Sequence, residues 1–348
     1  MLCAHVIAVS LLLSAGPPKF DPERTMAFFT WAPGYFCLAP DGKRLALDSW
    51  TVWDIAGRKP LVKGKTSGVH GMAISPDNRF LAVGGNYAEL RVYDLETGKL
   101  EWDLTLKHGN SIIQHLEFTP DSRYLVSSCC NGFLRSWDVR KKKAGFLFCF
   151  PAVGWYAKDG HEDTLREWRR AAGPKNLPDD AELFVTYKQK IEDFNQFAIH
   201  PDGKVVAVPA RAGGVLLIEL ATGKIAKTYA TKHEGSHSVC YSRDGKTLAV
   251  GGGSGDRSGW KSTIELWNVS TGKRVRTMKG HKHTVLKMAF SPDGKTLASG
   301  GTVDGLRVWD TATGKQIRHI YGEDDSEYRV VNVAFMPDGK TLLALRGF

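Results

Sequence analysis

The feature that most constrains the fold of this chain is a short turn motif that recurs along its length. The motif is Pro, or once Arg, followed by Asp and then by Gly, Asn or Ser. It begins seven times, at Pro40, Pro76, Pro120, Pro201, Arg243, Pro292 and Pro337. The spacings are 36, 44, 81, 42, 49 and 45 residues, so five are close to one unit and the longest is close to two. Such a period is typical of repeat architectures.

Each turn lies between two short apolar runs and therefore reads as the corner of a β-hairpin. One clear copy is VLKMAF at 285–290, then SPDG, then KTLAS. Proline presets φ at the start of the turn, and Gly or Asn accepts a positive φ at its end. In four units an aromatic or apolar residue followed by an acidic one comes 17 residues after the turn proline, as in Trp309-Asp310. Each unit is thus predicted to hold four short strands.

In combination these motifs resemble the WD-repeat (WD40) β-propeller family over residues 20–348. One unit contains Gly-His, SPDGKTLASG and LRVWD in order. The resemblance implies an all-β fold in which four-stranded antiparallel blades close into a ring, and the seven turns predict a seven-bladed β-propeller. It also implies a non-catalytic protein–protein interaction scaffold, which we expect to be a monomer.

In the best-formed blades of that family a His, a Ser or Thr, an Asp and the Trp are hydrogen-bonded together. His281, Ser299 and Trp309 match this set in position, whereas Asp304 is displaced by one residue. The resemblance therefore implies a structural rather than a catalytic role for His281.

The repeat lapses within residues 151–190, which we interpret as a partly helical insertion in the propeller. The stretch TLREWRRAAG reads as a helix, because Thr164 and Glu167 form a capping box and Gly173-Pro174 would end it. The alternative is a degenerate eighth blade, since WYAKDG at 155–160 echoes the turn motif.

Residues 1–16 have two interpretations. Their apolar run, HVIAVSLLLSAG, has the length of a secretory signal peptide core, which predicts an exported protein with no transmembrane segment in the mature chain. Alternatively, the run is the third strand of the last unit, which the chain end leaves incomplete, and the protein is cytoplasmic. In either case ERTMAFF at 23–29 is expected to be the outer strand that closes the ring.

No stretch of the sequence carries a convincing catalytic signature. HEGSH at 233–237 matches a zinc-protease pattern, but that chemistry needs both His on one helix face, and here they lie in a loop between strands. GGGSGDRSGWKS at 251–262 lacks the Gly-Lys-Ser of a phosphate loop. The six Cys form no CxxC pair and are expected to be buried thiols. We therefore predict no catalytic residue, metal site or cofactor; the alternative is a propeller-based hydrolase with a site at the ring mouth.

Charge and aromatic residues predict two different faces. The formal net charge is +10. The first and third turns of each unit share one face. Their lysines should make this face positively charged, so an anionic partner could bind there. That face should carry Lys43, Lys99, Lys204, Lys224, Lys246, Lys273, Lys295, Lys315, Lys340 and the run Arg140-Lys141-Lys142-Lys143.

The opposite face receives the irregular loops, and aromatic residues on loops are common binding hot spots. We predict that the loops GSGDRSGW and 151–190 contact a protein partner, which the sequence does not identify. The predicted contacts are Trp155, Tyr156, Trp168 and Trp260. For Trp168 the alternative is a structural role, because it shares a stripe with Leu165 and Ala172.

Overall fold

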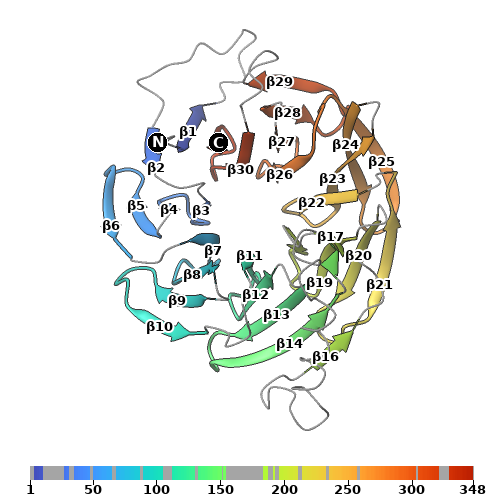
Figure 1. Ribbon diagram of the computed structural model, residues 1–348. Coiled ribbons are helices and arrows are strands. Elements are labelled where there is room, and N and C mark those ends of the chain that lie inside the picture. Colours follow the sequence, from blue (N-terminus) through green and yellow to red (C-terminus); the bar gives the residue numbers. More distant parts are fainter. Residues whose placement is uncertain are drawn as a thin grey trace.

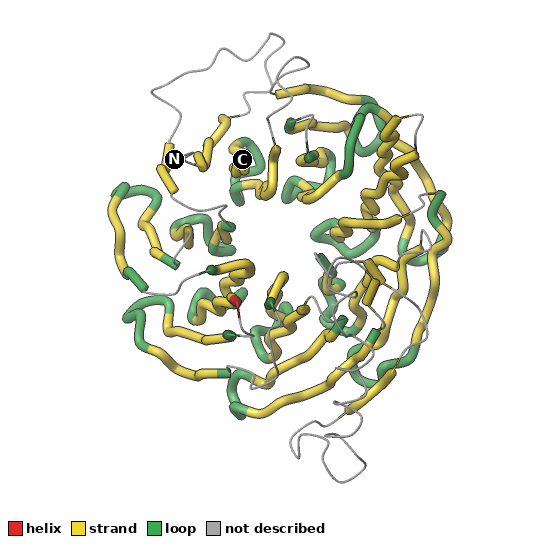
Figure 2. Tube along the Cα trace, in the orientation of Figure 1, coloured by secondary structure: helices red, strands yellow, loops and turns green. Residues whose placement is uncertain are grey.

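The computed structural model describes most of the chain as strands and turns arranged in a ring (Figure 1). The described residues are 4–10, 27–30, 35–47, 50–64, 68–86, 89–104, 112–129, 132–150, 152–153, 183–186, 191–192, 196–210, 214–232, 235–256, 259–302, 305–320 and 329–347. Within these ranges no α-helix occurs, and Figure 2 shows strands joined by short loops, with only a short 3₁₀ turn at Asn86. No helix in these ranges has the length and apolarity needed to span a membrane.

Six sheets are four-stranded and antiparallel, and the first strand of each is the one nearest the ring centre (Figure 1). Three of them contain β3 (Phe36–Leu38), β4 (Arg44–Leu47), β5 (Thr51–Asp54) and β6 (Lys59–Val62); β7 (Val69–Ile74), β8 (Phe80–Gly85), β9 (Leu90–Asp94) and β10 (Leu100–Asp103); and β18 (Ala198–Ile199), β19 (Val205–Ala210), β20 (Gly214–Glu219) and β21 (Ile225–Ala230).

The other three four-stranded sheets lie in the C-terminal half of the ring, the last of them completed by N-terminal strands. They contain β22 (Gly235–Tyr241), β23 (Thr247–Asp256), β24 (Gly259–Asn268) and β25 (Lys273–Lys279); β26 (Val285–Phe290), β27 (Thr296–Gly301), β28 (Leu306–Asp310) and β29 (Gln316–Ile320); and β30 (Arg329–Phe335), β31 (Thr341–Gly347), β1 (Ala4–Ser10) and β2 (Ala27–Thr30).

The expectation of seven four-stranded blades and a helical insertion needs correction in the middle of the chain. One sheet has five strands: β11 (Ile113–Phe118), β12 (Tyr124–Cys129), β13 (Phe133–Asp138), β14 (Lys143–Cys149) and β16 (Leu183–Thr186), the last parallel to β14. A separate two-stranded sheet contains β15 (Ala152–Val153) and β17 (Ile191–Glu192). The described parts of the insertion are therefore strands, because the outer edge of β14 offers unpaired backbone groups to a β-prone segment.

The remaining predictions for the insertion concern residues 154–182, which lie outside the described residues. These include the helix at 164–173 and the turn-like WYAKDG. The structure thus replaces a partly helical insertion by added β-structure wherever it describes that segment.

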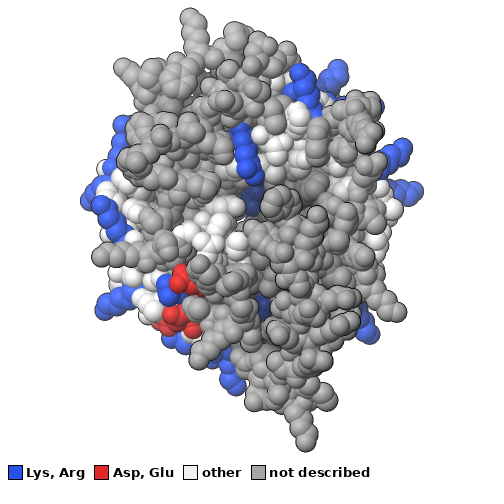
Figure 3. All heavy atoms as spheres, in the orientation of Figure 1, with Lys and Arg blue, Asp and Glu red and all other residues white. Residues whose placement is uncertain are grey.

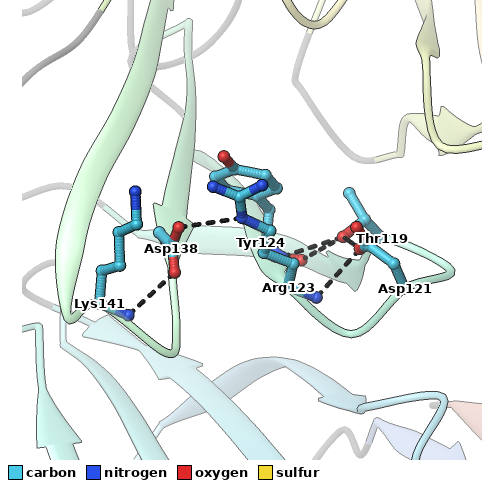
Figure 4. Close-up of polar contacts among 6 residues, drawn as sticks. All are labelled: Thr119, Asp121, Arg123, Tyr124, Asp138 and Lys141. Atoms are coloured by element: carbon cyan, nitrogen blue, oxygen red, sulfur yellow. Dashed lines mark hydrogen bonds and ion pairs between the residues drawn. The ribbon is translucent and has the colours of Figure 1, made fainter.

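The recurring turn is held together by its own side chains, as the β11–β12 corner shows (Figure 4). The Thr119 hydroxyl donates to Asp121 at 2.6 Å and accepts the Tyr124 backbone N–H at 2.9 Å. Asp121 also accepts the Arg123 backbone N–H at 3.0 Å. At the same end of this sheet, the β13–β14 turn places Asp138 to accept Arg123 Nε at 3.1 Å and the Lys141 N–H at 2.9 Å. The turn carboxylates are consequently occupied within their own sheet.

The two ends of the chain meet in the last sheet (Figure 1). β1 is an internal strand that pairs with β31 from His5↔Arg346 to Ser10↔Thr341, and β2 pairs with its other side. Between the last and first sheets, Asn332 Nδ2 donates to the Phe36 carbonyl at 2.7 Å. The export signal proposed for residues 1–16 remains a prediction beside this strand pairing.

Candidate functional site

The aromatic residues predicted to contact a partner lie mostly outside the described part of the chain. Trp155, Tyr156 and Trp168 fall in residues 154–182. Trp260 lies in β24, where its backbone pairs with Gly255 of β23. The segment GSGDRSGW was expected to be an irregular loop, and this expectation was wrong: β23 and β24 continue through most of it as an extended hairpin of ten residues on each side.

The His–Ser–Trp set of the best-formed unit is a structural network. Ser299 Oγ accepts a hydrogen bond from Trp309 Nε1 at 2.8 Å and lies 2.7 Å from His281 Nε2. All three side chains are buried between neighbouring sheets. Asp304, the displaced member, lies outside the described residues.

The zinc-protease interpretation is not favoured by the local structure. His233 and Glu234 are outside the described residues, and Gly235 begins a strand, so His237 has strand rather than helix geometry. Among the side chains that the structure describes, no three of His, Cys, Asp or Glu gather closely enough to hold a metal ion. Cys37, Cys129 and Cys240 are not in disulfides, and their side chains are buried or half-buried.

A cavity of about 430 Å³ lies among the innermost strands of four sheets. Its walls come from the ends of β3, β22, β26 and β30 and from the turns that follow them. The apolar lining includes Phe36, Phe290, Phe335, Pro40, Pro292 and Pro337. Because turn residues form its rim, the cavity opens on the lysine-rich face of the first turns, opposite to the face with the inserted loops.

Two polar groups at this cavity have no partner among the described residues. Arg243, which occupies the turn position held by proline in the other six units, is exposed and makes no described hydrogen bond or ion pair. The Tyr241 hydroxyl is buried without a hydrogen-bond partner. Burial raises the pKa of Tyr241, so this hydroxyl stays neutral and able to donate. The cavity therefore combines an apolar interior with one cation and one uncommitted hydroxyl.

A second group of polar residues lies on the innermost strands of the ring, centred on β11. Three residues before the turn Pro or Arg, six units have Ala or Cys and only β11 has an acidic residue, Glu117. The Glu117 carboxylate accepts the Ile199 backbone N–H at 3.2 Å and lies 3.9 Å from His115 Nε2. This register position was visible in the sequence, but its meaning depends on the ring bringing β11, β18, β22 and β26 together around its centre.

Burial near the centre of the ring shifts the pKa values of Glu117 and of two neighbouring side chains. Burial raises the pKa of Glu117 to about 8, against the opposing effects of the Ile199 N–H and the Lys287 charge. Burial lowers the pKa of Lys287 to about 8, although the Glu117 charge opposes that shift. Burial also raises the pKa of the Cys240 thiol to about 12, which makes it a poor nucleophile at neutral pH. The group is therefore a weakly solvated acid–base pair without an activated thiol.

Comparison with known proteins agrees with this architecture. The family model described as "WD domain, G-beta repeat" matches residues 58–94, 102–138 and 272–310. Each match ends on the strand that carries the Tyr-Asp or Trp-Asp pair of its unit, which is β9, β13 or β28. Together with the ring of antiparallel sheets, they show WD repeats within a β-propeller fold.

Its curated relatives are distant in sequence. Telomerase protein component 1 from Mus musculus is 24% identical over 271 residues, 77% of this chain and 8% of that protein. Periodic tryptophan protein 2 from Arabidopsis thaliana is 27% identical, covering 79% of this chain and 26% of that protein. Serine-threonine kinase receptor-associated protein from Gallus gallus is 24% identical, covering 72% and 81%. The chain thus spans a small part of the first two and most of the third.

Proposed function

We propose that this protein is a non-catalytic interaction scaffold. The observation that supports this most is how its polar residues are distributed. The acidic residues of the turns and the His281–Ser299–Trp309 set are occupied within the blades, whereas Arg243, Tyr241 and an apolar cavity are left for a partner. The name of the chicken relative describes association with a receptor, which fits a role of this kind.

The test is recovery of a partner by the immobilised full chain from a lysate of its own organism, with mass spectrometry of the bound proteins. We expect a protein retained in stoichiometric amount at about 0.15 M salt, where exposed charge interactions are strongly screened. Turnover of generic esterase, peptidase or phosphatase substrates by the purified chain, abolished by a substitution in the ring, would instead support the propeller hydrolase.

The sheet count also enters this proposal. We take the five-stranded sheet β11–β14 with β16 to stand in the place of a blade, which gives a ring of seven. Its first four strands are antiparallel and connected in the same order as those of the other sheets, which supports this count. An experimental structure of the full chain tests it.

The lysine-rich face is a second candidate surface, for an anionic partner. All nine turn lysines named above are exposed, and so are Arg140 to Lys143. Figure 3 also shows Lys and Arg side chains around the circumference, with acidic side chains gathered over β9 and β10, where Arg91 pairs with Asp103 at 3.2 Å and Glu89 at 3.6 Å. Binding to heparin that persists at about 0.15 M salt supports a specific anionic partner; loss of binding there indicates only nonspecific attraction.

The opposite face, with its inserted segments, is proposed to contact a protein through aromatic side chains. Trp155, Tyr156, Trp168 and Trp260 are the candidate contacts, and the extended β23–β24 hairpin supports Trp260 most directly, since a strand pair fixes its backbone. Rigidly held aromatic residues bind with little loss of conformational entropy.

A further inference from the structure

We propose that the cavity among β3, β22, β26 and β30 binds a protein segment that presents an aromatic side chain next to a carboxylate. This inference rests on the proposed scaffold function and names the chemistry of one partner site. Three independent features of the cavity carry it: its apolar walls, its unpaired arginine and its uncommitted hydroxyl.

The walls provide the place for the aromatic side chain. Phe36, Phe290 and Phe335 come from three different sheets and line the same space together with turn prolines. A volume of about 430 Å³ lies within the range of roughly 300–1,000 Å³ common for ligand pockets. Aromatic rings pack favourably against such walls in edge or offset geometry. The interior therefore favours a large apolar group over a sugar or a base with many polar edges.

Arg243 provides the place for the carboxylate. Its neighbouring turn acids are committed elsewhere: Asp244 accepts from Ser242 Oγ at 2.7 Å, and Asp293 accepts from Ser291 Oγ at 2.6 Å. Both also accept a backbone N–H within their own turn, at 3.0 Å from Lys246 and from Lys295. The guanidinium is thus unmatched among the described residues, and its planar fork suits a carboxylate bidentately.

Tyr241 provides a hydrogen bond for the backbone of the bound segment. Its buried hydroxyl has no described partner, and a buried hydroxyl left unpaired costs free energy. A carbonyl oxygen of a bound peptide that displaces the groups covering this hydroxyl would accept its hydrogen and remove the cost. A nucleic acid is disfavoured as the occupant, because phosphate binding relies on several cations and this cavity carries only Arg243 on its described lining.

The test uses a random octapeptide display library selected on the immobilised full chain, followed by fluorescence anisotropy with the enriched peptides. We expect enriched sequences to place Phe, Tyr or Trp next to Asp or Glu. Replacing the acid by its amide, or the aromatic residue by Ala, should weaken binding about tenfold, the loss expected for a charged hydrogen-bonded contact or a buried ring.

Arg243→Pro is the decisive variant. It installs the residue present in the other six turns, and no described hydrogen bond uses the Arg243 backbone N–H, so the fold should be as stable as before or slightly more so. Binding of the enriched peptides should fall about tenfold. Arg140→Gln, at an exposed turn arginine on the same face, is the matched control and should bind as the wild type does.

Tyr241→Phe gives a second readout that a purely structural role would not produce. Removing an unpaired buried hydroxyl should leave the melting temperature unchanged or raise it, while peptide affinity falls about fivefold. Enrichment without an aromatic–acidic pattern, equal binding to the folded Arg243→Pro variant, or displacement of the peptides by an oligonucleotide at 0.15 M salt would overturn the site. If Arg243→Pro binds the peptides as the wild type does and still retains the lysate partner, the scaffold function stands and only this assignment is refuted.

Discussion

At the scale of single residues, Ser299 connects two buried side chains through one oxygen. Trp309 donates to it at 2.8 Å, and His281 lies 2.7 Å away on its other side. Ser299→Ala would leave the indole N–H without its acceptor in a site that water does not reach. We expect a loss of about 2 kcal/mol in the free energy of unfolding, measured by chemical denaturation.

Ser127 supplies the matched comparison for this effect. It accepts Trp137 Nε1 at 3.1 Å in the sheet β11–β14, and no histidine among the described residues is hydrogen-bonded to it. Ser127→Ala should therefore cost less, about 1 kcal/mol. Equal losses in the two variants would show that His281 adds nothing to the network.

Glu117 makes stability depend on pH in a direction opposite to that of an ordinary surface acid. Burial raises its pKa in the folded state to about 8, above the value of 4.5 for a free carboxyl. Between these values the folded protein holds a proton that the unfolded chain has released, so stability falls as pH rises from about 5 to 8. Glu117→Gln keeps an oxygen for the Ile199 N–H and removes the ionisation.

Thermal unfolding at pH 5 and pH 8 tests this effect. The melting temperature of Glu117→Gln should exceed that of the wild type more at pH 8 than at pH 5. Lys287 titrates nearby with a pKa lowered by burial to about 8, so its charge opposes part of the effect. A difference between variant and wild type that stays constant with pH would mean that the pKa of Glu117 is not raised in the folded protein.

Sequence reasoning reached some of these residues and missed others for a clear physical reason. The bonding of Ser299 to Trp309 was predictable, because both belong to one repeat unit and its motif fixes their spacing. The cavity at Arg243 was not: Phe36, Tyr241, Phe290 and Phe335 meet only because the ring places four distant units side by side. The missing proline at position 243 was the one visible signal.

At the scale of elements, the β23–β24 hairpin is the structure that most changes the interpretation of a motif. Its strands reach from Thr247 to Asp256 and from Gly259 to Asn268, longer than the corresponding strands of the other four-stranded sheets. The GSGDRSGW segment looked like a loop because Gly and Ser are poor strand formers. Pairing with an already formed strand overrides that weak preference.

Trp260 on this hairpin gives the prediction at this scale. Once a partner is known, Trp260→Ala should weaken binding by about 2 kcal/mol, the size of a hot spot, with little change in melting temperature. Leu100→Ala, at an exposed apolar residue on β10, is the control and should leave binding unchanged. Titration calorimetry and thermal unfolding together decide: loss of stability with unchanged binding would make Trp260 a structural residue.

The five-stranded sheet shows where the period alone fails. A spacing of 81 residues predicted extra material in one gap but could not say what it folds into. The segment LFVT at 183–186 is short and β-prone, and it adds to β14 in parallel, a pairing that no local motif encodes.

At the scale of the whole molecule, the ring is closed by strands from both ends of the chain. β1 is hydrogen-bonded on both edges, to β2 and to β31, so a proline within it should disrupt the last sheet. Val6 pairs with Phe28 on one side and Leu345 on the other. We expect Val6→Pro, in the full chain expressed without export, to lower the free energy of unfolding by roughly 2 kcal/mol or more and to promote self-association.

Leu13→Pro, beyond the end of β1, is the control for this substitution and should have a smaller effect. Denaturation and light scattering provide the two measurements. If Val6→Pro is as stable as the wild type and a mass spectrum of protein from the native organism begins near residue 17, the segment is an export signal. The repeat predicted that the ring must be closed from the N-terminal end, but not which of these two roles residues 1–16 have.

Ring closure also sets an order of events during synthesis. His5 pairs with Arg346, so the strand made first must wait for a partner made 341 positions later. At a translation rate of roughly 5–20 residues per second, that wait lasts about 20 to 70 seconds. During this wait, β2 can pair with one edge of the apolar segment AHVIAVS, but the edge that pairs with β31 has no partner. Chaperones and targeting factors that bind short apolar stretches would therefore meet β1 before its sheet is complete. Whether β1 joins the last sheet depends on whether these factors or β31 bind it first.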